Sequence, residues 1–267
     1  MYKKKSLGQH FLHAPAYLNK IIEAAKIAKG EWVLEVGPGD GALTDKLLEQ
    51  GARLIAVEKD ARMIPLLKNK YSDVSLYSLT IIEEDILRFD ISNHLPQEEM
   101  YKVVANIPYY ITGAFLKKFL SAEAQPSSMV LLVQKEVAER IVGRKSAKGG
   151  SASGGKESIL SLSVKAYGEP IYIKTVPSGA FSPPPQVDSA ILAIGNISRE
   201  RFTNLVHENR FFELVRTGFA QKRKLLGRNL EPILGPNYAD LLKMAGIPEK
   251  ARAEDVPLEK WLSLSEL

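Results

Sequence analysis

Short hydrophobic runs alternate with amphipathic segments between residues 15 and 194. Strand-like runs are expected at residues 32–36, 53–57, 78–82, 101–105, 129–133 and 187–194, and helical spacing at residues 15–29, 42–50, 66–70, 114–120 and 134–142. Glycines close several of the helical segments, as Gly30 and Gly51 do. This alternation is typical of right-handed βαβ units. It predicts an α/β fold with a mostly parallel sheet covered on both faces.

After residue 197 the spacing is helical only, over residues 201–209, 211–230, 238–245 and 258–264. The length of 267 residues exceeds that of one typical domain. We therefore expect an α/β domain at residues 1–197, which includes an N-terminal contact segment at residues 1–14, and a small all-helical domain at residues 198–267. Residues 143–156 are rich in Gly and Ser and basic, which is typical of a flexible surface loop. A tolerated insertion, a lid and an RNA-contact loop all fit that composition.

Composition excludes several kinds of chemistry. The chain has no cysteine, which excludes disulfides, thiolate metal sites, iron–sulfur clusters and a cysteine nucleophile. Its four histidines are scattered, so we expect no metal site. The basic N-terminus lacks the apolar run of a signal peptide, and no uncharged apolar stretch approaches the ~18 residues of a membrane span. The sequence thus predicts a cytoplasmic protein without a membrane anchor.

Positive charge is concentrated in the helical part of the chain. Residues 199–228 hold eight basic and three acidic residues, a surplus equal to the net charge of +5 of the whole chain. The compact run Lys222, Arg223 and Lys224, with Arg228 close by, is suited to a nucleic-acid backbone, although such runs are often only solvated faces. Further basic residues at 3–5 and in the loop at 143–156 are additional candidates for phosphate contacts.

A glycine-rich turn follows the first predicted strand. The G-x-G-x-G of residues 37–41 allows a ligand to approach the backbone closely, and Glu58 ends the next strand 19 residues after Gly39, where it can bind both hydroxyls of a ribose. Such a pair serves NAD and S-adenosylmethionine alike. The spacing is not the dinucleotide G-x-G-x-x-G, and the acidic Glu35 and Asp40 suit a cationic sulfonium better than a pyrophosphate.

Two further segments end predicted strands. Asp85 could accept a hydrogen bond from an adenine amino group while Ile86 packs on the ring, although a helix cap is an equally good interpretation. In Asn106-Ile107-Pro108-Tyr109, the Asn106 side-chain oxygen and the Ile107 carbonyl could accept from the two N–H groups of an exocyclic adenine amine and so favour its nucleophilic form. Pro108 favours an extended residue before it, and Tyr109 offers a ring for base stacking.

The Asn106–Tyr109 segment resembles the (Asp/Asn/Ser)-Pro-Pro-Tyr-type signature of amino-group methyltransferases. Together with residues 8–12 (GQHFL) and 181–190 (FSPPPQVDSA), it makes the chain similar to the ribosomal RNA adenine N6,N6-dimethyltransferase family over nearly its whole length. The similarity is greatest to the bacterial branch that acts on 16S rRNA. The resemblance implies a Rossmann-like class I methyltransferase that uses S-adenosylmethionine to dimethylate two adjacent adenosines in the hairpin loop near the 3′ end of small-subunit rRNA. It further implies a monomer that acts on the immature 30S subunit.

The resemblance also implies residue roles. Gln9, His10 and Leu12 would fold over the methionine part of the cofactor, and Gly37 and Gly39 would line it. Glu58 would bind the ribose, and Asp85 with Ile86 would recognise the adenine of the cofactor. Asn106 would contact both the cofactor and the target base. Tyr109 and, from the other side, Phe181 would pack on the target adenine. The reaction would be an in-line methyl transfer that needs neither a metal nor a covalent intermediate.

Three alternatives remain open. The related dimethyltransferases of large-subunit rRNA share these motifs, although residues 181–189 favour the small-subunit branch. The protein could act chiefly as a ribosome-assembly factor. A nicotinamide dehydrogenase fits the glycine-rich turn but not its spacing.

Overall fold

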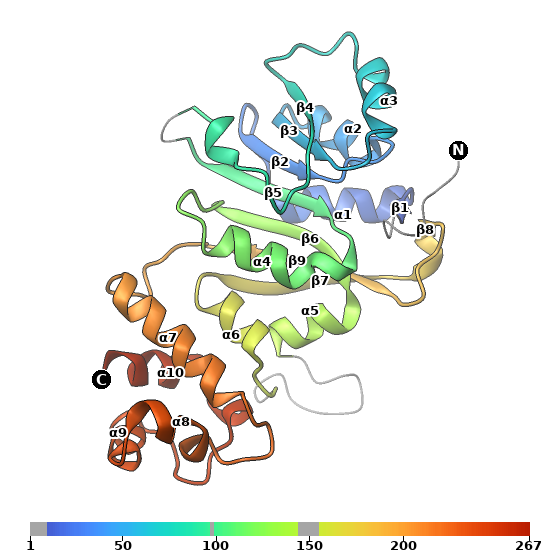
Figure 1. Cartoon of the computed structure of the whole chain (residues 1–267). Helices are drawn as coiled ribbons and strands as arrows, with labels where there is room; N and C mark the ends of the chain where they lie inside the picture. Colours follow the sequence, from blue (N-terminus) through green and yellow to red (C-terminus); the bar gives the residue numbers. More distant parts are fainter. Residues whose placement is uncertain (1–9, 97–98, 144–154) are drawn as a thin grey trace. The chain divides into compact units, whose positions relative to one another are not determined.

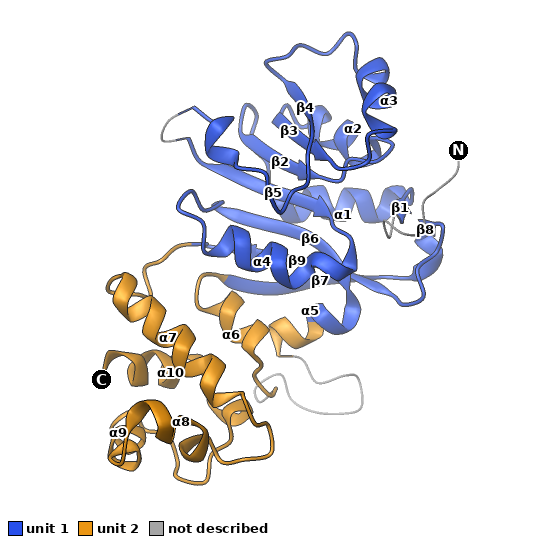
Figure 2. Ribbon diagram, in the orientation of Figure 1, with its two compact units in different colours: residues 1–138, 169–197 blue, residues 139–168, 198–267 orange. Residues whose placement is uncertain are grey.

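The computed structural model describes residues 10–96, 99–143 and 155–267. These residues form two compact units, which Figure 2 shows in different colours. Unit 1 contains the described residues within 1–138 and 169–197, and unit 2 those within 139–168 and 198–267. No helix in the described ranges has the length and apolar character that crossing a membrane requires.

A seven-stranded sheet forms the centre of unit 1, with the order β4-β3-β2-β5-β6-β9-β7 (Figure 1). The strands are β2 (Trp32–Val36), β3 (Arg53–Glu58), β4 (Leu79–Glu83), β5 (Tyr101–Asn106), β6 (Ser128–Gln134), β7 (Glu169–Val176) and β9 (Ser189–Gly195). The first five strands in this order are parallel, whereas β9 runs antiparallel to both β6 and β7. The predicted mostly parallel α/β sheet is confirmed.

Both faces of this sheet are buried. Alternate strand residues such as Val33, Leu54 and Val104 belong to a hydrophobic cluster with α1 (Pro15–Ala25) and α2 (Ala42–Glu49). Their neighbours of opposite orientation, such as Leu34 and Val103, are fully buried as well. This is the hydrophobic pattern of a parallel sheet with helices on both sides. The remaining helices of unit 1 are α3 (Met63–Lys70), α4 (Thr112–Leu120) and the beginning of α5 (Lys135–Val142).

A second, two-stranded sheet joins distant parts of unit 1. In it β1 (Phe11–Leu12) runs antiparallel to β8 (Phe181–Ser182), so that Leu12 faces Phe181 in the register. Both of these side chains are buried, and both belong to the hydrophobic cluster. The segment just before α1 is thereby fixed beside the segment just before β9.

Unit 2 is helical. It contains the end of α5, α6 (Ile159–Lys165), α7 (Leu205–Gly218), α8 (Leu226–Leu234), α9 (Tyr238–Met244) and α10 (Leu258–Glu266). Residues 139–168, which we had expected within the α/β domain, group with these helices. Their contacts explain why, because Tyr167 Oη donates to Glu208 Oε1 at 2.5 Å and stacks on Phe212. The expected boundary at residues 197/198 coincides with a boundary between the units.

The predicted single helix over residues 211–230 is wrong, because the chain turns between α7 and α8. The Asn229 side-chain amide donates to the carbonyl of Gly218 at 2.6 Å and to that of Gln221 at 3.2 Å, which stabilises the turn. A Cβ at Gly218 would lie 2.5 Å from the ring of Trp261, so only glycine permits this packing. The basic run at residues 222–224 therefore lies in a loop and not on a helix.

Candidate active site

A pocket in unit 1 opens at the carboxyl ends of the parallel strands. It encloses about 620 Å³ of space, part of which is open to solvent. Segments from β1, from the ends of β2, β3 and β5, and from the residues after them supply its wall: His10, Phe11, Gly37, Gly39, Glu58, Lys59, Asp60, Asn106, Ile107, Pro108, Tyr109 and Tyr110. Ligands of open α/β sheets bind at this edge.

The glycine-rich turn after β2 has a conformation that other residues rarely adopt. Gly37 and Gly39 have φ angles of 69° and 59°, in the left-handed region. The Gly37 N–H donates to the carbonyl of Val57 at 2.9 Å, which fixes the turn to the end of β3. The ring of Phe11 lies over Gly39 so closely that a Cβ there would approach it to 2.5 Å. The turn thus requires glycine both for its backbone and for this contact.

Glu58 links the glycine-rich turn to the strand beside it. Its Oε2 accepts from the Gly39 N–H at 3.2 Å and its Oε1 from the Asp60 N–H at 2.8 Å. The residue is only 6% exposed. Burial raises the pKa of this carboxyl, and the hydrogen bonds from the two N–H groups oppose that rise. A carboxylate fixed in this way on a pocket wall can accept from the two hydroxyls of a ribose.

Asn106 ends β5 and contacts the N-terminal segment. Its Nδ2 donates to the carbonyl of His10 at 2.8 Å. The Asn106 side-chain oxygen has no hydrogen-bond partner among the described residues, and the side chain lines the pocket. The amide is thus held by its nitrogen, which leaves an acceptor available to a ligand.

Tyr109 lies beside Asn106 and is held at both ends. Its hydroxyl is 2.6 Å from Ser189 Oγ, and its ring stacks with that of His10 at a centroid distance of 6.0 Å. The His10 ring is fixed in turn by a 2.8 Å hydrogen bond between Nδ1 and the carbonyl of Pro183. Burial raises the pKa of Tyr109, so its hydroxyl stays protonated at neutral pH.

Not every predicted cofactor contact lines this pocket. Asp85 forms an ion pair with Lys59 at 2.7 Å and accepts from the Leu87 N–H at 3.0 Å, and neither Asp85 nor Ile86 is on the wall. The Lys59 hydrogen bond is the largest influence that lowers the pKa of Asp85. Leu12 lines a smaller cavity that shares Phe11, Gly37 and Asn106 with the pocket. Gln9 lies outside the described residues.

Phe181 differs most from its expected position. Its ring is 5% exposed, belongs to the hydrophobic cluster and is absent from the pocket wall. The pairing of β8 with β1 is the cause, because it places Phe181 opposite Leu12. Contact between Phe181 and a target adenine stays a prediction.

Some wall residues were not foreseen. Phe11 belongs to a predicted segment, but its contact with Gly39 depends on a fold that brings residues 28 apart together. Lys59, Asp60 and Tyr110 are sequence neighbours of predicted residues, and that adjacency is the only signal that could have found them. Tyr110 is 65% exposed, so a large aromatic surface lies on the pocket wall accessible to solvent.

The wall fits the cofactor that the sequence suggested. Glu58 contributes a buried carboxylate, and Asp60 is paired with Arg62. Lys59 is paired with Asp85, so the lysine on this wall is already neutralised. A nucleoside with a cationic sulfonium suits these surroundings better than a pyrophosphate does.

The predicted RNA-binding residues all belong to unit 2. Lys222, Arg223 and Lys224 are exposed in the α7–α8 loop and form no ion pair with any described residue. Arg228 is in α8 and forms an ion pair with Glu231 at 3.3 Å. Three adjacent unpaired cations are available for contacts with phosphate groups.

Comparison with known proteins gives concordant results. The family model described as ribosomal RNA adenine dimethylase matches residues 1–267. A ribosomal RNA small subunit methyltransferase A from Dehalococcoides mccartyi is 44% identical over 98% of this chain and 87% of that protein. The protein of the same name from Fusobacterium nucleatum is 37% identical over 98% and 96%.

Solved structures show the same fold over nearly the whole chain. A dimethyladenosine transferase from Plasmodium falciparum has a TM-score of 0.74 and 28% identity, covering 96% of each chain. The 23S rRNA methyltransferase ErmE has a TM-score of 0.76 and 26% identity, covering 96% of this chain and 98% of its own.

Proposed function

Because this chain belongs to the ribosomal RNA adenine dimethylase family, we propose that it dimethylates N6 of two adjacent adenosines in the hairpin loop near the 3′ end of 16S rRNA. The enzyme is an S-adenosylmethionine-dependent rRNA adenine dimethyltransferase with a Rossmann-like fold. Its substrate is the immature 30S subunit in the cytoplasm, where it acts as a monomer. The names of its relatives, which specify the small ribosomal subunit, support the choice of substrate.

The observation that carries this proposal is the Asn106 side chain. Its nitrogen is held by the His10 carbonyl, and its oxygen, on the wall that also contains the glycine-rich turn, has no partner among the residues that the structure describes. The lone pair of an adenine N6 amine is delocalised into the ring, which makes the amine a poor nucleophile. Hydrogen bonds from its two N–H groups to Asn106 Oδ1 and to the Ile107 carbonyl favour the tetrahedral, nucleophilic form of the amine.

The other wall residues position the two substrates. Glu58 binds the ribose of the cofactor, and the glycines at 37 and 39 allow the cofactor to approach the backbone closely. Tyr109 stacks on the target base. Bound S-adenosylmethionine supplies an electrophilic methyl group and loses its positive charge on transfer. The excess proton on N6 leaves to water through Asn106 or the Ile107 carbonyl. Positioning and polarisation account for the catalysis.

The direct test is methyl transfer from labelled S-adenosylmethionine to small subunits that lack the modification, followed by identification of the modified nucleotide. We expect label in N6,N6-dimethyladenosine at two adjacent positions of 16S rRNA. Naked 23S rRNA is the comparison substrate, because the similarity to ErmE makes the large-subunit branch the second candidate. Preferential labelling of 23S rRNA would reject the small-subunit assignment.

A growth experiment tests the alternative role in ribosome assembly. Where deletion of the gene slows growth, normal growth of a strain that carries only the Asn106→Ala enzyme would indicate that ribosome assembly is the main role.

The exposed cations of unit 2 are proposed to bind the rRNA backbone. The paired charge reversal Lys222→Glu and Lys224→Glu should weaken RNA binding and flatten its dependence on salt, because fewer counterions are released. A matched control reverses Lys243 and Lys250, which are exposed in the same unit and have no ion-pair partner among the described residues. Equal salt slopes for wild type and the Lys222/Lys224 variant would show that the loop is only a solvated face.

A further inference from the structure

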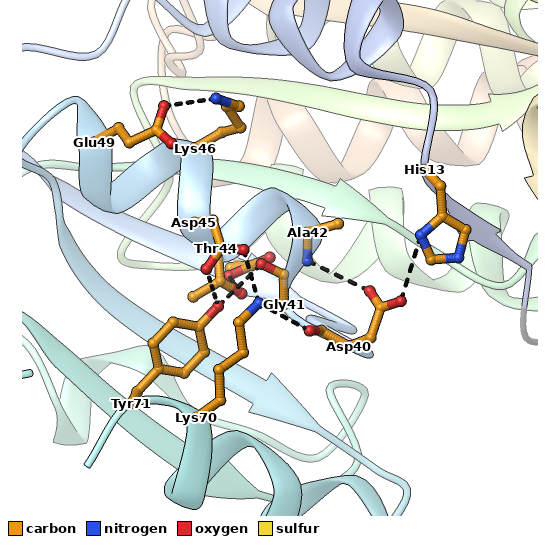
Figure 3. Close-up of polar contacts among 11 residues, drawn as sticks. His13, Asp40, Gly41, Ala42, Thr44, Asp45, Lys46, Glu49, Lys70 and Tyr71 are labelled. Atoms are coloured by element: carbon orange, nitrogen blue, oxygen red, sulfur yellow. Dashed lines mark hydrogen bonds and ion pairs between the residues drawn. The ribbon is translucent and has the colours of Figure 1, made fainter. Parts of the chain in front are cut away.

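Two consecutive residues at the end of another helix bind the glycine-rich turn. Lys70 ends α3 and Tyr71 follows it directly. Lys70 Nζ donates to the carbonyl of Asp40 at 3.1 Å, and Tyr71 Oη donates to the carbonyl of Gly41 at 2.9 Å (Figure 3). Consecutive side chains thus bind consecutive carbonyls of the turn.

The same two side chains bind one carboxylate in the first turn of α2. Asp45 Oδ2 is 2.7 Å from Lys70 Nζ, and Asp45 Oδ1 is 2.7 Å from Tyr71 Oη. The Tyr71 hydroxyl therefore shares its proton between the Asp45 carboxylate and the Gly41 carbonyl. Burial raises the pKa of Tyr71, so the hydroxyl remains a donor at any working pH. Figure 3 shows these groups converging on the start of α2.

Packing around Gly41 makes this arrangement specific. Gly41 precedes α2 with a φ of 84° and has no side chain to cap the helix. A Cβ at Gly41 would lie 2.3 Å from Tyr71 Oη and 3.0 Å from Lys70 Nζ. The glycine is thus required for close approach of Tyr71 as well as for backbone conformation. Beneath the turn, Thr44 donates to the buried Glu35 at 2.7 Å, which ties α2 to β2.

None of Lys70, Tyr71 and Asp45 lines the pocket. Their hydrogen bonds nevertheless fix residues 40 and 41, next to Gly39 on its wall. The orientation of a peptide determines where its N–H group points, and a ligand that depends on a glycine-rich turn depends on that orientation.

We propose that Tyr71, with Lys70, is a positioning residue for S-adenosylmethionine, which sets the peptide planes of the cofactor turn through the carbonyls of Asp40 and Gly41. Tyr71 acts on cofactor binding without touching the cofactor. Target-base binding and the methyl-transfer step itself do not depend on it.

Tyr71→Phe tests this proposal, because it removes one hydroxyl and keeps the ring. We expect the dissociation constant for S-adenosylmethionine, measured by isothermal titration calorimetry, to rise about three- to tenfold, which corresponds to one lost hydrogen bond. The kcat at saturating cofactor and the KM for RNA should stay within about twofold of wild type. Lys70→Met should give a change in the same direction, and the double variant a larger one.

Tyr101→Phe is the matched control. Tyr101 is a buried tyrosine of the same unit, and its hydroxyl donates to the Ala124 carbonyl at 2.9 Å, away from the pocket wall. Both variants should unfold at lower urea concentration than wild type, but Tyr101→Phe should bind the cofactor normally. Wild-type cofactor affinity in Tyr71→Phe, or equal weakening in Tyr101→Phe, would overturn the proposal. A wild-type enzyme that binds cofactor but leaves 16S rRNA unmodified would reject only the proposed substrate.

Discussion

The two walls of the pocket are built in different ways. On the wall that we propose to bind the cofactor, the cofactor wall, which is formed by the glycine-rich turn and Glu58, the polar groups are bonded to the backbone of neighbouring strands and loops. On the wall that we propose to bind the target base, the base wall, which is formed by residues 106–109, Asn106 and Tyr109 are bonded to the His10 segment and to Ser189. The first wall is supported by local neighbours, whereas the second depends on segments about 80 to 96 residues away in sequence.

This difference has a consequence for binding. The carboxylate and the turn of the cofactor wall need little rearrangement, and preorganised groups lose little entropy when a ligand binds. On the base wall the His10 ring already stacks with Tyr109. An adenine that stacks on the face of Tyr109 covered by His10 must displace that ring.

The largest effect is expected at the base wall. Asn106→Ala removes the unpaired acceptor and should lower the single-turnover rate by ~10²-fold or more, the scale of one lost preorganised polar contact. Asn93→Ala, at an exposed asparagine elsewhere in unit 1, is the control. A near-normal rate in Asn106→Ala would remove this residue from the mechanism.

A substitution on the cofactor wall should lower the affinity for S-adenosylmethionine only. Glu58→Ala removes a buried carboxylate and should weaken S-adenosylmethionine binding by about 1.5–3 kcal/mol, the range for hydrogen bonds to a charged group. RNA affinity should be unchanged. Glu83→Ala is the control, because Glu83 faces Glu58 in the register of β3 and β4 but is exposed. An unchanged cofactor titration in Glu58→Ala would refute the role assigned to Glu58.

Two substitutions of Tyr109 distinguish the stacking of its ring from the hydrogen bond of its hydroxyl. Tyr109→Ala should weaken RNA binding by about 1–3 kcal/mol through loss of base stacking. Tyr109→Phe keeps the ring and loses only the contact with Ser189, so its effect should be much smaller. Binding titrations with unmodified small subunits measure both. Equal losses in the two variants would mean that the hydroxyl, and not the ring, is what the base wall needs.

Local sequence signals were enough to predict where the glycine-rich turn and Glu58 lie in the sheet. Gly37 and Gly39 adopt the left-handed backbone conformation that glycine tolerates best. Glu58 lies where the neighbouring strand ends. Both facts follow from short segments and from the topology of a parallel sheet. The position of Asn106 at the end of β5 follows from the same rule.

Features that depend on distant contacts were not predicted. Gly218 is the local signal for the end of α7, but residues 219–225 contain neither glycine nor proline, and the turn also depends on contacts of Asn229 and Trp261. The covering of Phe181 comes from pairing with a strand some 170 residues earlier in the sequence. Strand β7 is an omission of another kind, because its Ile, Tyr, Thr and Val residues are typical of a strand.

The last prediction concerns the support beneath the cofactor wall. Burial raises the pKa of Glu35 to about 8, with the charges of Asp45 and Glu58 acting in the same direction and the Thr44 hydrogen bond and Lys70 opposing them. Near neutral pH the folded protein therefore holds this carboxyl mainly in its neutral form, whereas the unfolded chain ionises it near its ordinary pKa of 4.5. A raised pKa in the folded state means that stability is greatest at low pH and falls as pH rises toward 8.

Glu35→Gln should remove this dependence, because an amide of similar shape does not titrate. Between about pH 6 and pH 7 the wild type should lose roughly 1.4 kcal/mol of unfolding free energy relative to the variant, the slope expected for one proton. Urea denaturation at the two pH values measures the difference, and Glu49→Gln on the exposed side of α2 is the control. If the wild type instead showed no loss of stability relative to the variant, Glu35 would already be ionised at pH 6, as a carboxyl held by a charged partner is. The cofactor wall would then be supported by an ion pair and not by a neutral, buried acid.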